Sequence, residues 1–209
     1  MLLTGFDAFG GDSINPSWLA VRALHGRQIA GHTVVAAQLP TVFGESLREL
    51  HGLLVRHQPA LVICVGQAGG RSAFSLERIA INVDDAPIPD NAGAQPIDVP
   101  VAPGAPAAYF STLPIKAMLA ALQREGLPAE VSQTAGTFVC NHVFFGLMHT
   151  IAANPELRDT RGGFVHVPWL PEQGTPNMAL DDVVRGLRVA VRAALGAPQD
   201  TSLAAGATH

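Results

Sequence analysis

Short apolar runs alternate along this chain with segments of helical periodicity, and this alternation is the feature that most limits the possible folds. The runs are LLTGF, TVVAAQLP, LVICVG, SLERIAINV, AEVSQTA and GFVHVPW, and the helical patterns cover 16–25, 43–57, 114–126, 137–152 and 179–195. Strands that alternate with helices indicate an α/β protein. We expect a three-layer α/β/α sandwich with a twisted, mostly parallel central sheet.

Capping signals place the ends of two of these helices. Asn15 followed by Pro16 supplies an N-cap and a proline at the first helical position. Pro114 opens and Gly126 closes the helical stretch that contains KAMLAALQRE. Both patterns are typical of helix termini, because proline fits the first turn and glycine tolerates the backbone angles that follow the last turn.

The length of 209 residues lies in the range of one domain. We expect a single α/β domain over residues 1–196 and a flexible tail over residues 197–209, which are mostly small or polar. Between 67 and 106 the chain is rich in glycine, proline and aspartate. A long irregular segment within a compact domain is usually either functional or disordered.

Composition argues against several kinds of partner. The net charge is only −4 and no basic run is interleaved with aromatic residues, so we expect no nucleic-acid partner. No apolar stretch approaches the roughly 20 residues that span a bilayer, and the N-terminal segment lacks the basic region of a signal peptide. We therefore expect a cytoplasmic protein with no membrane partner. Two cysteines are too few for a disulfide framework or a structural zinc site, so we expect no metal and no other cofactor.

Cys140 stands near the start of the helical segment 137–152, where Thr137 is the expected N-cap. A helix N-terminus favours an anion, and the thiolate is the nucleophilic form of cysteine. Cys140 also shares the helical spacing of Phe144 and Leu147. It is therefore either a catalytic nucleophile or a small buried hydrophobic residue. The other cysteine, inside LVICVG, is expected in the core.

Three histidines are candidate bases for Cys140. His142 follows two residues later, on nearly the opposite face of a helix, and His149 lies well beyond the first turn. His166 ends the strand-like run GFVHV, and ligands of open α/β sheets bind beyond the carboxyl ends of the strands. His166 is the favoured base, and a hydrogen-bonded core histidine is the alternative.

Glu77 lies in SLERIAINVDD, where it shares strand parity with Ile79, Ile81 and Val83. A continuous strand would therefore point Glu77 toward the apolar side, where a carboxylate needs a cation or hydrogen-bond donors. Because the adjacent Arg78 lies on the opposite face, a histidine oriented by Glu77 is the favoured arrangement. A structural ion pair, or a register that exposes Glu77, is the alternative.

The motifs of this chain occur in an order that resembles a known family. They are TGFDAFGG with NPS, GQAGGR with SLERIAINVDD and IPDN, AYFSTLPIKAM, TAGTFVCNH with GLMH, and GGFVHVPWLPEQ. From residue 2 to about 173 their succession is similar to pyroglutamyl-peptidase I, the pyrrolidone-carboxylate peptidase family of cysteine peptidases. Matches this long and numerous are far more specific than one short motif.

The resemblance implies that the protein hydrolyses an N-terminal pyroglutamyl residue from peptides through a thioester. It implies Cys140 as nucleophile, His166 as base and Glu77 as the acid that orients the histidine. It also implies a homotetramer. The residues that it assigns to the pocket for the pyrrolidone ring are Phe6, Phe9, Thr41, Gln67 with its neighbouring main chain, Ile88, Phe138 and Val139. For the two phenylalanines of TGFDAFGG, core packing is the alternative.

Two positions depart from the family pattern. Ala8 stands where the family often has proline, which is a loop change with little chemical meaning. Pro87 stands where the family usually has arginine, so a cation near the site is missing. Arg71, in the motif GQAGGR, is another cation that precedes Pro87 in the sequence.

Other functions have weaker support. A metal-dependent amidohydrolase built on Asp84, Asp85 and Asp90 would lack HExxH or a comparable spacing. GQAGGR lacks the GK[ST] ending of a phosphate-binding loop. A catalytically weak pyroglutamyl-peptide binder is the remaining alternative, and the intact Cys140, His166 and Glu77 argue against it.

Overall fold

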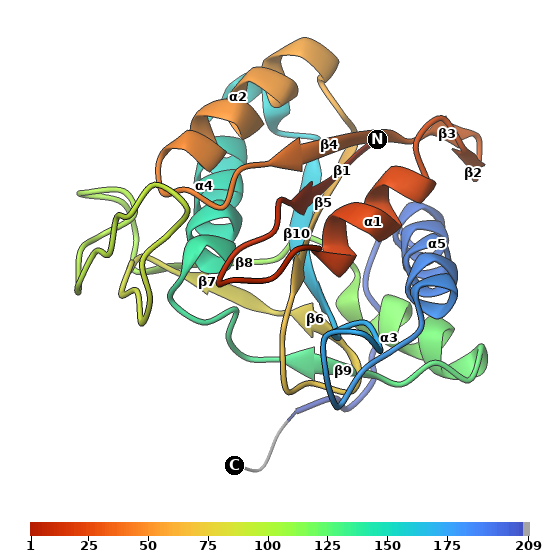
Figure 1. Cartoon of the computed structure of the whole chain (residues 1–209). Coiled ribbons are helices and arrows are strands. Elements are labelled where there is room, and N and C mark those ends of the chain that lie inside the picture. The colour runs from red at the N-terminus through yellow and green to blue at the C-terminus, as the bar shows by residue number, and fades with distance from the viewer. Residues whose placement is uncertain (207–209) are drawn as a thin grey trace.

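The computed structural model describes residues 1–206 and contains a central sheet of six strands with helices on both faces (Figure 1). The strand order is β4-β1-β5-β10-β6-β9. These strands are β1 (Leu2–Phe6), β4 (Val35–Leu39), β5 (Leu61–Gln67), β6 (Phe74–Glu77), β9 (Ala129–Ser132) and β10 (Arg161–Val167). All neighbours are parallel except β6 and β10. The predicted α/β/α sandwich with a mostly parallel sheet is confirmed.

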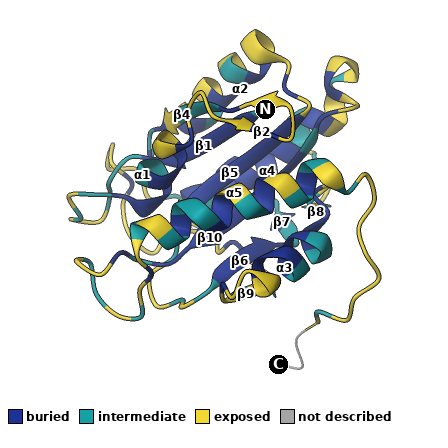
Figure 2. Ribbon diagram, turned by 90° about the vertical axis from the view of Figure 1, so that its right-hand side faces the viewer, coloured by how far each residue is buried: buried dark blue, intermediate teal, exposed yellow. Residues whose placement is uncertain are grey.

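The helices form two layers. One layer contains α1 (Pro16–Ala23), α3 (Ile115–Arg124) and α5 (Leu180–Gly196), and the other contains α2 (Glu45–His57) and α4 (Val139–Ala153), which the short helix η1 (Pro155–Leu157) follows. Figure 2 shows α5 with exposed residues along its outer side and buried residues toward the strands. Each layer therefore covers one apolar face of the sheet, as amphipathic helices do.

Two small sheets stand apart from the central one. β2 (Gln28–Ile29) pairs with β3 (His32–Thr33), and β7 (Ile79–Ile81) pairs with β8 (Ala108–Phe110). The expectation of one strand over SLERIAINV is wrong, because the chain changes sheets at Arg78. The Arg78 N–H donates to Ser132 O beside β9, whereas its carbonyl accepts from Ser111 N beside β8.

The capping predictions for α1 and α3 are confirmed. The Asn15 side chain accepts a hydrogen bond from Ser17 N at 3.0 Å, with Pro16 at the first helical position. Gly126 follows α3 with a φ of 71°, in the left-handed region that favours glycine.

The segment after α5 returns to the body of the protein. The Asp200 carboxylate accepts hydrogen bonds from Lys116 N and Ala117 N at the uncapped start of α3, with shortest distances of 3.0 and 2.9 Å. The division into a domain over 1–196 and a flexible tail over 197–209 stays a prediction. Its last part, residues 207–209, lies outside the described residues.

Strand alternation separates the side chains of the central strands into two cores. In β5, Leu61, Ile63 and Val65 face the layer of α1 and α5, and Val62 and Cys64 face the layer of α4. Cys64 is fully buried, which confirms its predicted place in the core. Gly66 continues the α4-facing row at the carboxyl end of the strand.

Gly5 of β1 lets α1 lie directly against the sheet. A Cβ atom added at Gly5 would lie 2.6 Å from Trp18 N and 2.7 Å from Ser17 C, both backbone atoms of α1. We therefore expect Gly5→Ala to lower the free energy of unfolding by about 1–3 kcal/mol through overpacking. Chemical denaturation would measure this change.

Gly52→Ala is the matched control, because Gly52 is an exposed residue within α2 whose added Cβ would meet nothing within 4 Å. It is expected to stabilise the protein by about 0.5–1 kcal/mol, since alanine is the better helix former. Equal effects of the two substitutions would contradict the close packing of α1 on β1.

Candidate active site

A buried hydrogen bond joins Glu77 to His166. His166 Nδ1 lies 2.8 Å from Glu77 Oε1, with Glu77 at 0% and His166 at 4% exposure. The two strands run antiparallel, and His166 is paired with Ser75, which lies on the same strand face as Glu77. Because a carboxylate only accepts hydrogen bonds, the Nδ1 proton lies toward Glu77 and leaves Nε2 of a neutral ring as an acceptor.

The sulfur of Cys140 rests above the strand next to His166. A Cβ atom added at Gly66 would lie 2.9 Å from Cys140 Sγ, and Gly66 is the β5 residue paired with His166 of β10. The absent side chain of Gly66 therefore makes room for the thiol beside the imidazole. Among residues 1–206 the sulfur makes no hydrogen bond with His166, a common feature of catalytic pairs without bound substrate.

Burial and the charge of Glu77 together raise the pKa of the Cys140 thiol to about 12, and the charge of Arg71 opposes them. This raised pKa runs against the expectation of a stabilised thiolate, because burial disfavours the charged form. The resting group is a neutral thiol at neutral pH. Attack by its sulfur then requires a base that removes the proton during the reaction.

The first turn of α4 presents free backbone donors beside Cys140. The N-cap is Phe138 and not Thr137, whose hydroxyl donates instead to Asp85 O at 2.7 Å. Among the described residues, nothing accepts a hydrogen bond from the N–H groups of Val139 and Cys140. Such uncapped groups at a helix N-terminus are suited to an oxyanion.

Glu77 has a second partner, Arg71, which sequence reasoning left without a role. Arg71 Nη1 donates to Glu77 Oε1 at 2.8 Å, the same oxygen that His166 contacts. Glu77 is thus both the orienting acid and a member of an ion pair. The prediction that Glu77 is buried is correct. The reason given for it, a strand face shared with Ile79 and Ile81, is wrong, because these two residues belong to another sheet and are only half-buried.

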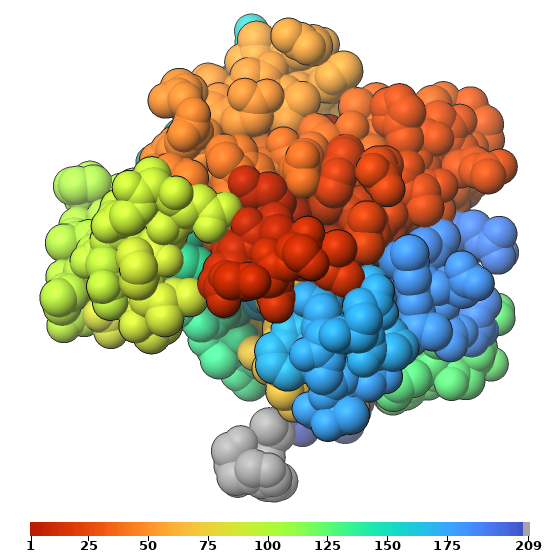
Figure 3. Space-filling model, in the orientation of Figure 1, coloured from red at the N-terminus to blue at the C-terminus, as the bar shows by residue number. Residues whose placement is uncertain are grey.

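Two residues expected to bind substrate lie at the aromatic rim of this site. Phe9 and Phe138 are half-buried, with ring centroids 5.8 Å apart. Ile88 is 40% exposed, and a Cβ atom added at Gly10 would lie 3.8 Å from its side chain. Figure 3 shows the red segment near residue 10 beside the yellow-green segment that includes Ile88.

The other four expected binding residues are buried. Phe6 and Val139 belong to the core beneath the site. Thr41 binds the β1–α1 loop through Asp7, and the Gln67 side chain is tied to Asp12 at 3.1 Å. Thr41 and Gln67 therefore fix loops at the carboxyl ends of the strands. The substrate-binding roles of all seven residues assigned to the pocket stay predictions.

Sequence reasoning missed Phe43, whose ring stands edge-on to Phe138 with centroids 5.4 Å apart. The signal was weak, since Phe43 occurs in no motif with chemical meaning. His142, excluded as the base, contacts Asp84 Oδ2 at 2.8 Å and accepts from Gly44 N at 2.9 Å, so its ring links α4 to two loops. His149 contacts the Tyr109 hydroxyl.

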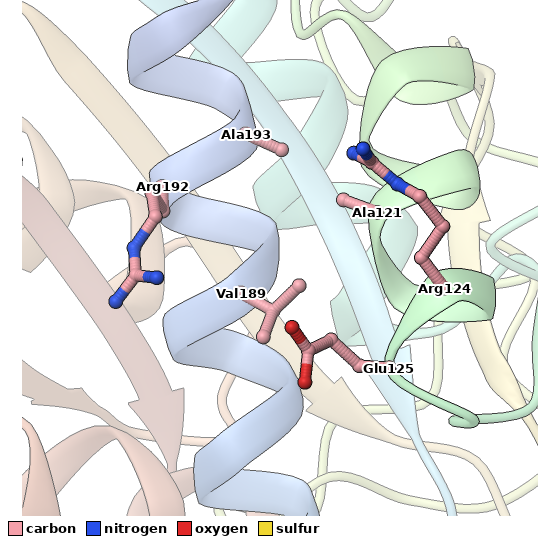
Figure 4. A pocket seen from close by; sticks show the side chains of 6 residues that line it. All are labelled: Ala121, Arg124, Glu125, Val189, Arg192 and Ala193. Atoms are coloured by element: carbon pink, nitrogen blue, oxygen red, sulfur yellow. The ribbon is translucent and has the colours of Figure 1, made fainter.

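The hollow between α3 and α5 is a poor candidate site. Its volume is about 380 Å³, and Figure 4 shows its lining of Ala121, Arg124, Glu125, Val189, Arg192 and Ala193. Both helices lie in the layer opposite α4, and the lining contains no nucleophile or histidine. Within residues 1–206 no group of three or more His, Cys, Asp or Glu residues is arranged to hold a metal ion, and no helix is long and apolar enough to cross a membrane.

Comparisons with known proteins agree with this geometry. The family described as pyroglutamyl peptidase matches residues 1–197. The chain is 57% identical to pyrrolidone-carboxylate peptidase 1 of Ralstonia nicotianae and 56% identical to pyrrolidone-carboxylate peptidase of Erwinia tasmaniensis, covering 100% of this chain and 99% of each relative. The crystal structure of pyroglutamyl peptidase I from Bacillus amyloliquefaciens superposes with a TM-score of 0.95 at 46% identity, covering 97% of this chain and 98% of that one.

The raised thiol pKa gives a prediction about alkylation. Because the pKa of Cys140 is raised from 9.0 to about 12, the thiolate fraction grows throughout the neutral range. The rate of modification by iodoacetamide is therefore expected to rise steadily between about pH 6 and pH 9. Mass spectrometry of digested protein should locate the label on Cys140 and not on the fully buried Cys64. A rate that levels off below neutral pH would instead indicate a preformed thiolate.

Proposed function

The chain belongs to the pyroglutamyl peptidase family, and we propose that it hydrolyses the bond after an N-terminal pyroglutamyl residue of a peptide. Cys140 is the nucleophile, His166 the base and Glu77 the residue that orients His166. The observation that carries this assignment is the buried hydrogen bond between Glu77 and His166 beside Gly66, over which the Cys140 sulfur rests.

Acylation begins when His166 Nε2 takes the proton of the Cys140 thiol as the sulfur attacks the pyroglutamyl carbonyl carbon. The carbonyl oxygen becomes an oxyanion, and the free N–H groups of Val139 and Cys140 at the start of α4 donate to it. Glu77 keeps the Nδ1 proton in place and stabilises the imidazolium. The carbon–nitrogen bond then breaks, His166 protonates the departing amine, and a thioester remains.

Deacylation uses the same imidazole. After the amine leaves, His166 Nε2 is again an acceptor and removes a proton from a water molecule that attacks the thioester carbonyl. The carbon–sulfur bond breaks, the sulfur recovers a proton from His166, and pyroglutamate is released. No step requires a metal or another cofactor.

Specificity for the lactam ring would follow from the rim of Phe9, Phe138 and Phe43. The pyrrolidone ring is flat and uncharged, so it can contact these rings while its N–H and C=O groups meet backbone near Gln67. A prolyl residue with a free amino group would carry a positive charge into this apolar surround. Burying that charge without a partner is costly.

The turnover of a fluorogenic pyroglutamyl amide tests the proposal. Wild-type protein is expected to release the fluorophore from the pyroglutamyl amide and not from the matching prolyl amide. Cys140→Ala is expected to lower kcat by about a thousandfold or more, because no other nucleophile is positioned to form the thioester.

Cys64→Ala is the matched control, since it removes the other thiol from the core and leaves Cys140 in place. It is expected to keep activity within about threefold, and EDTA is expected to have no effect. Turnover that survives Cys140→Ala would exclude the thioester mechanism.

We also propose a cytoplasmic homotetramer. A reducing compartment suits an enzyme that depends on a free thiol. Three large apolar side chains in the segment between β7 and β8 are exposed, Ile88 at 40%, Ile97 at 71% and Val99 at 43%. This segment projects from the body at the left of Figure 1. Contact with another copy of the chain would remove such side chains from water.

Sedimentation velocity tests the tetramer. The expected species has four times the chain mass of 21.8 kDa, with no dissociation in moderate salt because the exposed side chains of the projecting segment are apolar. A particle with the mass of one or two chains would contradict the proposal.

A further inference from the structure

Arg71 approaches Glu77 from the loop between β5 and β6 and is fixed at three points. Its Nη1 atom donates to Glu77 Oε1 at 2.8 Å and to Ser132 Oγ at 3.4 Å, and its Nη2 atom donates to Thr134 O at 3.2 Å. The Arg71 side chain is 30% exposed, whereas the Glu77 side chain is completely buried. The guanidinium therefore closes the solvent side of the pair between Glu77 and His166.

Both hydrogen bonds of the buried Glu77 carboxylate are made to the same oxygen. Both His166 and Arg71 contact Glu77 Oε1, and Oε2 is buried without a hydrogen-bond partner among the described residues. A neutral His166 supplies a donor but no charge. Arg71 is thus the residue that balances the Glu77 charge in the resting site, since a buried carboxylate without a cation is strongly disfavoured.

We propose that Arg71 is a positioning residue for the reaction, which acts through Glu77 to keep the site electrically neutral while Cys140 and His166 exchange a proton. With Arg71 present, the carboxylate and guanidinium cancel, and the reaction adds only a thiolate and an imidazolium. Without Arg71, the resting site has one uncompensated negative charge. That charge opposes a thiolate at Cys140 and favours an imidazolium at His166 before substrate binds.

The electrostatics at Cys140 agree with this role. The charge of Glu77 raises the pKa of the thiol, and the charge of Arg71 lowers it. Removal of Arg71 would leave the first effect unopposed.

The experiment compares Arg71→Gln, Arg71→Lys and Arg78→Gln with wild type. Arg78 is the matched control, because it is adjacent to Glu77 in sequence and binds Gln133 Oε1 at 3.0 Å, and within residues 1–206 it pairs with no carboxylate. Three quantities are measured for each variant: kcat and KM as functions of pH, the rate of Cys140 alkylation by iodoacetamide, and the thermal unfolding temperature.

Arg71→Gln is expected to shift the acid limb of kcat/KM upward by about one pH unit and to slow alkylation about tenfold at neutral pH, since a nearby charge shifts a pKa by about 1–3 units. KM is expected to change little, because the Arg71 guanidinium is already engaged by Glu77, Ser132 and Thr134. Arg71→Lys keeps the charge and is expected to restore most of both properties. Arg78→Gln is expected to change neither. If the pH–rate profile of Arg71→Gln superposes on that of wild type, Arg71 only holds loops together and the inference is wrong.

A double variant keeps the test decisive if Arg71→Gln does not fold. Glu77→Gln/Arg71→Gln is compared with wild type and with Glu77→Gln, because removing both charges avoids an unpaired buried ion. If Arg71 acts by balancing the Glu77 charge, the double variant is expected to be alkylated within about threefold of the wild-type rate, because the two charges cancel in one protein and are absent from the other. A double variant alkylated about tenfold more slowly than wild type would overturn the inference. The inference rests on the proposed peptidase function, but alkylation needs no substrate, so its outcome is separate from any failure of turnover.

Discussion

The hydrogen bond between Glu77 and His166 is the interaction on which the site depends. It requires β6 to enter the sheet antiparallel to β10, the one exception to parallel pairing in the central sheet within residues 1–206. In this antiparallel pairing Ser75 lies opposite His166. Glu77, two residues later on the same face of β6, can therefore reach the imidazole from within the sheet. A carboxylate with no solvent exposure must then be satisfied by His166 and Arg71.

The position of the thiol follows from sheet alternation and one missing side chain. His166 and Gly66 lie opposite each other on the same face, and the helix start of α4 brings Cys140 down onto Gly66. Burial of the sulfur, together with the charge of Glu77, raises the thiol pKa to about 12 although Cys140 lies at a helix N-terminus. A thiol of such low acidity needs a base in order to attack a carbonyl carbon, and His166 is the proposed base.

Sequence patterns predicted what depends on local chemistry. Asn15 before Pro16 defines α1, and strand–helix alternation defines the layers. The patterns failed where a distant contact outcompetes a local one. Thr137 caps no helix because its hydroxyl binds Asp85 O, and the run through Arg78 divides because each half finds a different partner strand. A structural ion pair was kept as an alternative for Glu77, but its partner Arg71 was not identified, since the geometry depends on loops that meet only in the folded chain.

The irregular segment between β7 and β8 shows how buried polar groups replace regular structure. The Asp90 carboxylate accepts from Ala92 N and Ala94 N within its own turn, and from Phe43 N across to the loop before α2. Asp84 fixes the other end of the segment through His142, two residues after Cys140. These contacts satisfy backbone donors that a sheet would otherwise pair. They also hold Phe43 and Ile88 at the aromatic rim, so the segment that looked least ordered in sequence shapes the entrance to Cys140.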